Sequence, residues 1–219
     1  MLDTDTIMML VEGTRDTLYM TLMSTLFGYV LGLPMGIILT VTDKDGIRPN
    51  AAVYKVLDVI VNILRSVPFL ILLILVMPFT KAIVGKTYGS TATIVPLVIA
   101  AAPFIARMVE SSLKEVDPGV IEAAVSMGAG TGTVIWKVML AEARTSLLVG
   151  VTIAIGTILG YSAMAGTVGG GGLGDIAIQY GYYRYETEIM IVTVVVLVVL
   201  VQILQSIGMM GSRKLDKRK

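Results

Sequence analysis

The stretch IMIVTVVVLVVLVQILQSIGMM, residues 189–210, runs for 22 residues without a charged side chain. About 20 apolar residues in a helix are enough to cross the hydrocarbon core of a bilayer. The whole chain shares this character, because 55% of its 219 residues are hydrophobic and only 15% are charged, against about 25% charged in ordinary soluble proteins. Mean hydropathy is +0.84. The sequence therefore predicts an all-α integral membrane protein.

Cysteine and histidine are both absent from the chain. Their absence excludes disulfides, thiolate or imidazole metal sites, and any nucleophile paired with a histidine base. A net charge of only +1 argues against a nucleic-acid partner. We expect no catalysis, cofactor or metal in this chain. Its first five residues include two aspartates where a cleavable signal would be basic, so we expect the chain to be mature from its start.

Five segments are predicted to cross the membrane, all within a single domain of residues 1–219. Pro96 and Pro103 lie seven residues apart in the third segment, which we expect to bend. Gly28, Gly32 and Gly36 are spaced by four in the first, a pattern typical of closely packed helices. The predicted spans are residues 17–41, 56–80, 90–109, 145–168 and 187–210.

The second span differs from the others because its first half is charged. Asp58, Asn62 and Arg65 follow one another at i, i+4 and i+7, so they share one face of a helix. Exposing this face to lipid would be costly. We expect it to lie against protein, water or the membrane surface, on a helix that begins in the cytoplasm and continues into the bilayer.

Lysine and arginine are distributed unequally between the segments that connect the spans. If the N-terminus is outside, 13 of the 17 basic residues fall on the inner side and four on the outer side. Because basic residues are enriched in cytoplasmic segments, we predict an outer N-terminus and an inner C-terminus. This orientation places residues 110–144 in a long cytoplasmic loop.

The 110–144 loop is predicted to contain a short exposed helix. Asp117 is a favourable N-cap, Pro118 a favourable first helical residue, and Gly128 a favourable end. A second helix is expected at about residues 133–143. The first helix has apolar side chains that it cannot bury alone. It therefore either docks into a groove of another protein or lies on the membrane surface among lipid headgroups, and the pattern leaves both open.

One motif in this loop resembles the EAA loop of permease subunits in ATP-binding-cassette (ABC) importers. Glu122, Ala123 and Ala124 are followed by three residues and Gly128, and after nine more by Val-Met-Leu-Ala at residues 138–141. The family pattern ends in Ile-x-Leu-Pro, so this chain departs from it at its first and last positions. The resemblance favours docking and assigns Glu122, Ala123, Ala124 and Gly128 to a coupling helix seated on the ATPase.

Further stretches resemble the methionine branch of this family and cover most of residues 14–210. They are LRSVPF at residues 64–69, AAPFIARMVE at 101–110, GYSAM at 160–164, and GGLG at 171–174 followed by QYGY at 179–182. On this resemblance we nominate residues of the translocation path and its gate, namely Arg65, Ser66, Pro68, Tyr161, Ser162 and Met164.

The resemblance implies a type I ABC importer permease fold and a multi-pass protein of the bacterial cytoplasmic (inner) membrane. Two copies would form the path for methionine, L- and possibly D-methionine. The partners would be membrane lipid, two cytoplasmic ATPases that bind ATP and Mg, and an extracytoplasmic methionine-binding protein. The permease itself would not be an enzyme. The alternatives are an ABC permease for a different amino acid or small polar solute and, less favoured, a secondary transporter, whose internal repeats and mid-membrane carboxylates are missing.

Glycine is concentrated in one segment that this function does not explain. Gly169, Gly171 and Gly174 satisfy the G-x-G-x-x-G pattern of dinucleotide-binding proteins, but they follow a predicted membrane helix, and the motif requires a preceding strand. We expect instead a mobile external loop, which could contain a hinge for an outer gate.

Overall fold

The computed structural model describes residues 3–215, and this part of the chain contains helices and no strand. The fold is thus all-α, as predicted. In chain order the elements are α1 (Thr4–Thr42), α2 (Ala51–Ser66), α3 (Phe69–Leu75), α4 (Met77–Val84), α5 (Ser90–Lys114), α6 (Pro118–Ser126), α7 (Thr131–Thr133), the π-helix η1 (Val134–Met139), α8 (Leu140–Glu142), α9 (Arg144–Ala165), the 3-10 helix η2 (Gly166–Val168), α10 (Gly172–Ile176), the π-helix η3 (Ala177–Tyr182) and α11 (Thr187–Leu215).

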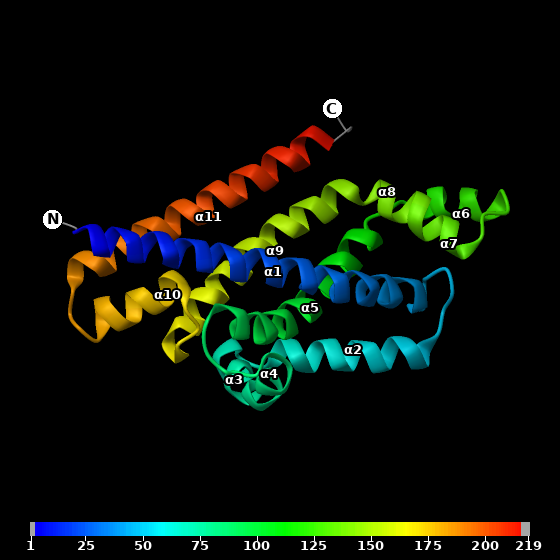
Figure 1. Ribbon diagram of the computed structural model, residues 1–219. Coiled ribbons are helices and arrows are strands. Elements are labelled where there is room, and N and C mark those ends of the chain that lie inside the picture. The colour runs from blue at the N-terminus through cyan, green and yellow to red at the C-terminus, as the bar shows by residue number, and fades with distance from the viewer. Residues whose placement is uncertain (1–2, 216–219) are drawn as a thin grey trace.

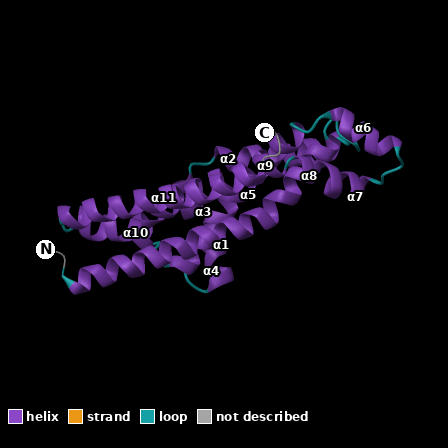
Figure 2. Ribbon diagram, turned by 90° about the horizontal axis from the view of Figure 1, so that it is seen from above, coloured by secondary structure: helices purple, strands orange, loops and turns teal. Residues whose placement is uncertain are grey.

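The long helices run lengthwise in an elongated bundle (Figure 1). Helices α6 and α7 project from one end, which we call the α6 end, whereas α10 and the start of α1 lie at the other, the α10 end. The view from above shows the same arrangement (Figure 2). The short loop helices therefore stand apart from the bundle instead of covering it.

Four helices are long and apolar enough to cross a membrane: Thr4–Thr42, Ser90–Lys114, Arg144–Val168 and Thr187–Arg213. Each contains a predicted span, and α5 accommodates both of its prolines in one continuous helix. A fifth crossing requires α2 and α3 to be counted together as one bent span. The prediction of five spans therefore depends on this pair.

The second predicted span is not the single helix that we expected. Residues 56–80 are divided among α2, α3 and α4, and α2 and α3 meet at an angle of 103°. The bend lies at Val67 and Pro68. Val67 has extended backbone angles (φ −80°, ψ 124°), which is the conformation that a following proline imposes, and proline cannot continue the hydrogen bonding of α2.

Helices α1 and α5 pack at very short range because α1 presents glycine to α5. A Cβ atom built on Gly32 would lie 2.6 Å from the carbonyl oxygen of Ala102, and one on Gly36 would lie 2.6 Å from that of Ala106. Gly28 faces Ala101 in the same way. The glycine spacing in the first predicted span is therefore a helix contact, as its sequence pattern indicated.

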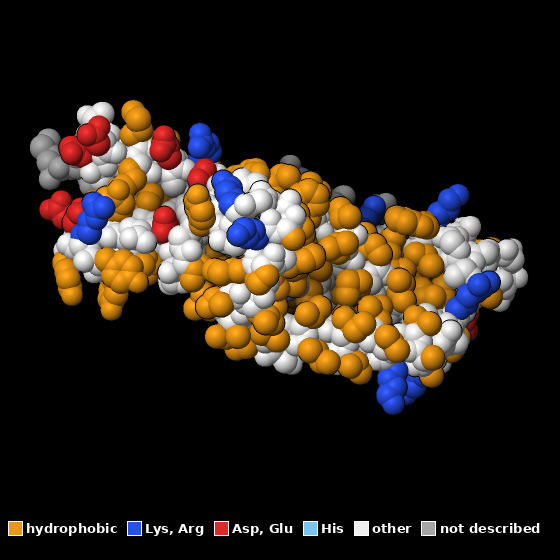
Figure 3. Space-filling model, turned by 60° about the horizontal axis from the view of Figure 1, so that its bottom comes forward, with side chains coloured by type: hydrophobic (Ala, Val, Ile, Leu, Met, Phe, Trp, Pro, Cys, Tyr) orange, Lys and Arg blue, Asp and Glu red, His pale blue; other side chains and the backbone are white. Residues whose placement is uncertain are grey.

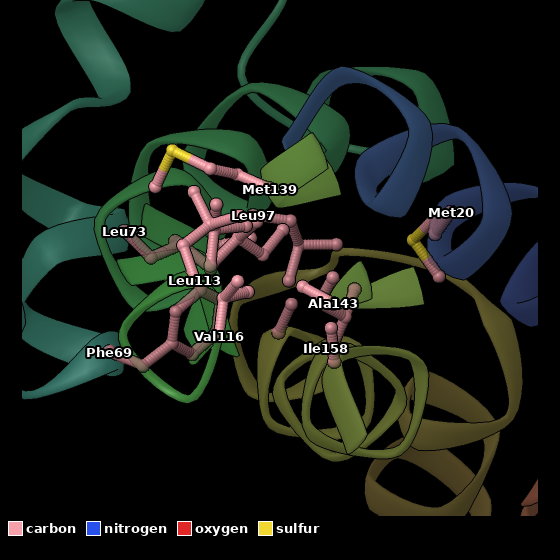
Figure 4. Packing of buried hydrophobic residues seen from close by; sticks show 14 of the residues in the cluster. Met20, Phe69, Leu73, Leu97, Leu113, Val116, Met139, Ala143 and Ile158 are labelled. Atoms are coloured by element: carbon pink, nitrogen blue, oxygen red, sulfur yellow. The ribbon is translucent and has the colours of Figure 1, made fainter. Parts of the chain in front are cut away.

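The main core connects the bundle with the base of the loop helices (Figure 4). Leu97, Ile105 and Ile158 are fully buried in its central part. At the α6 end the same cluster includes Leu113, Val116, Ala124, Val134 and Met139. The start of the loop is thus anchored in the same apolar core as the long helices.

Hydrophobic side chains cover the broad middle of the face shown in Figure 3, and acidic side chains gather mainly at the α10 end. Large exposed apolar residues occur along α1 and α11, for example Leu26, Val30 and Val198. Water would not favour so wide an apolar surface. A lipid environment around the middle of the bundle explains it.

Candidate functional site

Helix α6 begins and ends at the residues that the sequence marks. The Asp117 side chain accepts a hydrogen bond from the Gly119 amide at 2.7 Å, and Pro118 is the first helical residue. Gly128 is left-handed with φ +82°, and the Ala129 amide then donates to the carbonyl of Ala124 at 3.1 Å. This closure turns the chain sharply back toward the bundle.

The four residues of the EAA motif do not share one face of α6. Glu122 and Ala123 are exposed, whereas Ala124 is 7% exposed and belongs to the chain's own core. Ala124 therefore helps to fix α6 to the protein, and its part in seating the helix on an ATPase stays a prediction. Gly128 is exposed, and a Cβ built on it would meet nothing within 4 Å.

Large apolar side chains of the α6 segment and of η1 are exposed to solvent. Met127 is 82% exposed and Val125 52% exposed, and Trp136 of η1 is 67% exposed. None of the residues that the structure describes covers these groups. Exposure of this kind next to a single carboxylate is typical of a protein-docking surface.

A groove of about 950 Å³ lies between α6 and the segment that connects α1 to α2. Its lining is partly apolar and partly charged, and it includes Ile47, Leu113, Lys114, Ile121 and Glu122. The motif glutamate therefore stands at a hollow, and not on a flat surface.

A network of charged side chains lies behind this groove. Glu110 of α5 is 5% exposed and accepts hydrogen bonds from Arg107 at 2.6 Å and Lys114 at 2.8 Å. Lys114 also contacts Asp43, which follows α1, at 2.7 Å. A buried carboxylate is stable only when it is paired, and Glu110 is paired twice.

The charged face of α2 joins the same network. Arg107 donates to Asp58, and to Asn62 at 2.9 Å. The predicted stripe of α2 therefore faces protein over its first two residues. Arg65, the third, is exposed and forms none of the ion pairs found within residues 3–213. No group of three or more Asp, Glu, His or Cys residues in the described part of the chain is arranged to hold a metal ion.

The hydrogen bond from Lys114 lowers the pKa of Asp43 below its ordinary value. Because the folded-state pKa is lowered, the contact stabilises the fold above the unfolded-state pKa of about 3.9 and is lost as the pH falls through the folded value. We expect Asp43→Asn to lower the free energy of unfolding at pH 7 and to make no difference in strong acid. Denaturant titrations of both forms from pH 7 down to pH 2 would measure this, and a difference as large at pH 2 as at pH 7 would contradict it.

The predicted path residues come from two segments, residues 65–68 and residues 161–164, and one aromatic contact joins these segments. The ring of Tyr161 stacks on that of Phe69 with centroids 4.7 Å apart and planes at 5°. Phe69 follows Pro68 directly at the start of α3. The stack therefore brings the Pro68 bend next to Tyr161 of α9.

The remaining nominated residues do not converge on this stack. Ser162 is buried and donates to the carbonyl of Leu159 within its own helix. Ser66 donates to the carbonyl of Asn62 within α2, and Met164 is 48% exposed. In a single copy of the chain, these residues and Arg65 do not line one enclosed site, and their role in transport stays a prediction.

The glycine-rich segment is not the mobile loop that we expected. Cβ atoms built on Gly166 and Gly174 would lie 2.2 and 2.3 Å from backbone atoms of the facing segment. The Leu173 amide donates to the Thr17 hydroxyl of α1, and the Thr93 hydroxyl of α5 donates to the carbonyl of Gly170. These glycines allow η2 and α10 to pack against their neighbours, so the segment is a fixed part of the bundle.

Two features escaped the sequence reasoning. Phe69 belongs to the LRSVPF stretch but is not among the predicted path residues, and nothing in the sequence marks its stacking partner. The ionic network did have a signal, because Arg107, Glu110 and Lys114 are spaced by three and four and so share one helix face. Their partners on α1 and α2 became identifiable only with the fold.

The long apolar helices and the projecting loop define a polytopic membrane protein with a candidate docking helix on a turn between two of them. The chain belongs to the family of inner membrane components of binding-protein-dependent transport systems, whose model matches residues 32–218. It is accordingly a multi-pass protein of the inner membrane.

Its relatives match most of the chain. The probable D-methionine transport system permease protein MetI of Vibrio cholerae is 53% identical over 210 residues, which are 96% of this chain and 93% of that protein. The D-methionine transport system permease protein MetI of Escherichia coli is 50% identical over 158 residues, 72% of this chain and 73% of that protein.

Solved structures agree with the sequence relatives. A chain of the MetNI methionine ABC transporter in an inward-facing conformation has a TM-score of 0.97 and 46% identity, and the match covers 99% of this chain and 100% of that one. A chain of an amino acid ABC transporter has a TM-score of 0.78 at 20% identity, covering 98% and 99%, a likeness that shows the fold alone. The type I importer permease fold is thereby confirmed.

Proposed function

We propose that this chain is the permease subunit of an ATP-driven importer for methionine. Two copies form the translocation path, two ATPase subunits bind ATP and Mg below it, and a binding protein delivers methionine from outside. The permease hydrolyses nothing. In the membrane, the N-terminus and the α10 end face outward, and the α6 end faces the cytoplasm.

The observation that carries this proposal is the construction of α6. Its N-cap and its left-handed Gly128 isolate a two-turn helix beyond the bundle, and Glu122 stands there beside apolar side chains that no residue within 3–215 covers. A carboxylate with an apolar surround suits a cationic, groove-shaped partner surface. The relatives and the solved chain of a methionine transporter favour methionine as the substrate.

Reconstitution tests the function directly. Liposomes containing this chain, its ATPase and its binding protein should accumulate radiolabelled methionine only when ATP is supplied on the ATPase side. Unlabelled L-methionine, D-methionine and a different amino acid, added as competitors, would define the substrate. Uptake that persists in liposomes without the ATPase would overturn the proposal.

Reversing the charge of Glu122 should separate uptake from membrane insertion. In Glu122→Arg, loss of a charge pair with the ATPase is expected to reduce ATP-dependent uptake by roughly tenfold or more, while the purified chain keeps its helix content. Glu142→Arg makes the same change at another exposed residue of the loop and serves as the control. Equal uptake by the two variants would show that Glu122 has no special part in coupling.

A further inference from the structure

Lys114 is the point at which three helical segments are tied together. Its ammonium group lies 2.7 Å from Oδ2 of Asp43, after α1, and 2.8 Å from Oε1 of Glu110 on α5. It also lies 5.9 Å from the ring centroid of Tyr54 on α2, and the Tyr54 hydroxyl is 3.5 Å from the same Glu110 oxygen. One cation thus contacts groups from α1, α2 and α5.

The same residue is the last one of α5 before the chain leaves for α6. Only residues 115–117 separate Lys114 from Pro118, the first residue of α6. Leu113 and Val116, on either side of Lys114, are 1% and 7% exposed, so the link is held in the core. A displacement of α6 must therefore reach Lys114 within three residues.

Helix α6 has a second connection to the bundle, of a different kind. Ala124 packs with Val134 and Met139 of η1 in the core cluster, and η1 continues through α8 into α9. This connection is apolar and follows the chain toward α9. The polar contacts of Lys114, by contrast, reach the ends of α1 and α2.

We propose that Lys114 is a positioning residue for energy coupling. Through Asp43 and Glu110 it makes α1, α2 and α5 respond together when the ATPase moves α6, so that nucleotide binding tilts a unit of three helices and not α5 alone. This inference rests on the proposed function. It assigns Lys114 no contact with methionine or with ATP.

The test measures how many methionine molecules enter per ATP hydrolysed, in liposomes with the complete importer. Lys114→Met keeps the length of the side chain and removes its charge. We expect the ratio to fall about fivefold or more, the lower end of typical coupling between sites, while the variant still binds the ATPase and hydrolyses ATP. Lys114→Arg restores a cation and should recover most of the ratio.

Lys44→Met is the matched control, because Lys44 belongs to the same region and its side-chain ion pair, 3.7 Å from Asp45, is exposed, with side chains 84% and 83% exposed. Such pairs contribute little, and its ratio should equal that of the wild type. Simple loss of folded protein would lower uptake and hydrolysis together and would leave their ratio unchanged. A lower ratio in Lys114→Met, and its recovery in Lys114→Arg, therefore indicates a positioning role.

A Lys114→Met ratio within twofold of the wild type would overturn the inference. If that variant fails to assemble, Asp43→Asn replaces it, since this change removes the charge pair between Lys114 and Asp43 and leaves the contact between Lys114 and Glu110. An unchanged ratio in Asp43→Asn would equally overturn the inference. A wild-type chain that shows no ATP-dependent uptake would instead overturn the proposed function.

Discussion

Replacing Gly32 by leucine is expected to break the packing of α1 against α5. Even the Cβ atom would lie 2.6 Å from the carbonyl oxygen of Ala102 and 2.8 Å from Cβ of Ile105. Neither atom can move aside by a rotamer change, so the two helices must separate. Overpacking of an interior typically costs about 1–3 kcal/mol, and a clash with backbone should reach about 3 kcal/mol or more. Denaturant unfolding in detergent micelles, followed by circular dichroism, would measure the loss.

Gly211→Ala is the corresponding control within a long helix. Gly211 lies in α11, and a Cβ atom built on it would meet nothing within 4 Å. Alanine is the better helix former by about 0.5–1 kcal/mol, so this variant should be as stable as the wild type or more stable. If Gly32→Leu unfolded at the same denaturant concentration as Gly211→Ala, the close approach of α1 and α5 would be refuted.

Removing the buried carboxylate of the ionic network should have a similarly large effect. Glu110→Ala leaves Arg107 and Lys114 without their shared acceptor, while Arg107 remains only 19% exposed at its side chain. Breaking a buried ion pair from one side costs about 3–5 kcal/mol. We expect the lower end of this range, because the Lys114 side chain is 43% exposed and can reach water. The same unfolding titration would record it.

Glu115→Ala provides the comparison for this change. Glu115 is exposed and lies one residue beyond α5, so its removal should alter the free energy of unfolding by less than about 0.5 kcal/mol. A double variant of Glu110 and Lys114, both made apolar, should recover part of the loss, because it leaves fewer uncompensated charges. A Glu110→Ala protein as stable as Glu115→Ala would mean that the network does not hold the α6 end together.

The two structural features also have a functional relation. The glycine contact joins α1 to α5 within the bundle, and the network joins the ends of the same helices beside α6. Together they form one of the two routes that connect the loop helix to the membrane-spanning part. A loosened α1–α5 contact should therefore also reduce coupling in the proposed transport cycle.

Much of the fold was readable from the sequence because the signals are local. Continuous apolar runs mark membrane helices whatever their neighbours are, and the caps at Asp117 and Gly128 fix the ends of α6 by backbone chemistry alone. The glycine spacing in α1 likewise predicted a close helix contact. The motif that starts at Glu122 could be located for the same reason, since it is contiguous in the chain.

What the tertiary structure decided is the set of relations between distant segments. The angle of 103° at Pro68, the stacking of Phe69 on Tyr161 and the burial of Ala124 within its own chain depend on which helices become neighbours. The same holds for Lys114, whose charge and i,i+4 spacing from Glu110 the sequence displays but whose second partner, Asp43, follows a different helix. Hydrophobicity and capping are determined residue by residue, whereas pairing and packing arise only when the chain closes on itself.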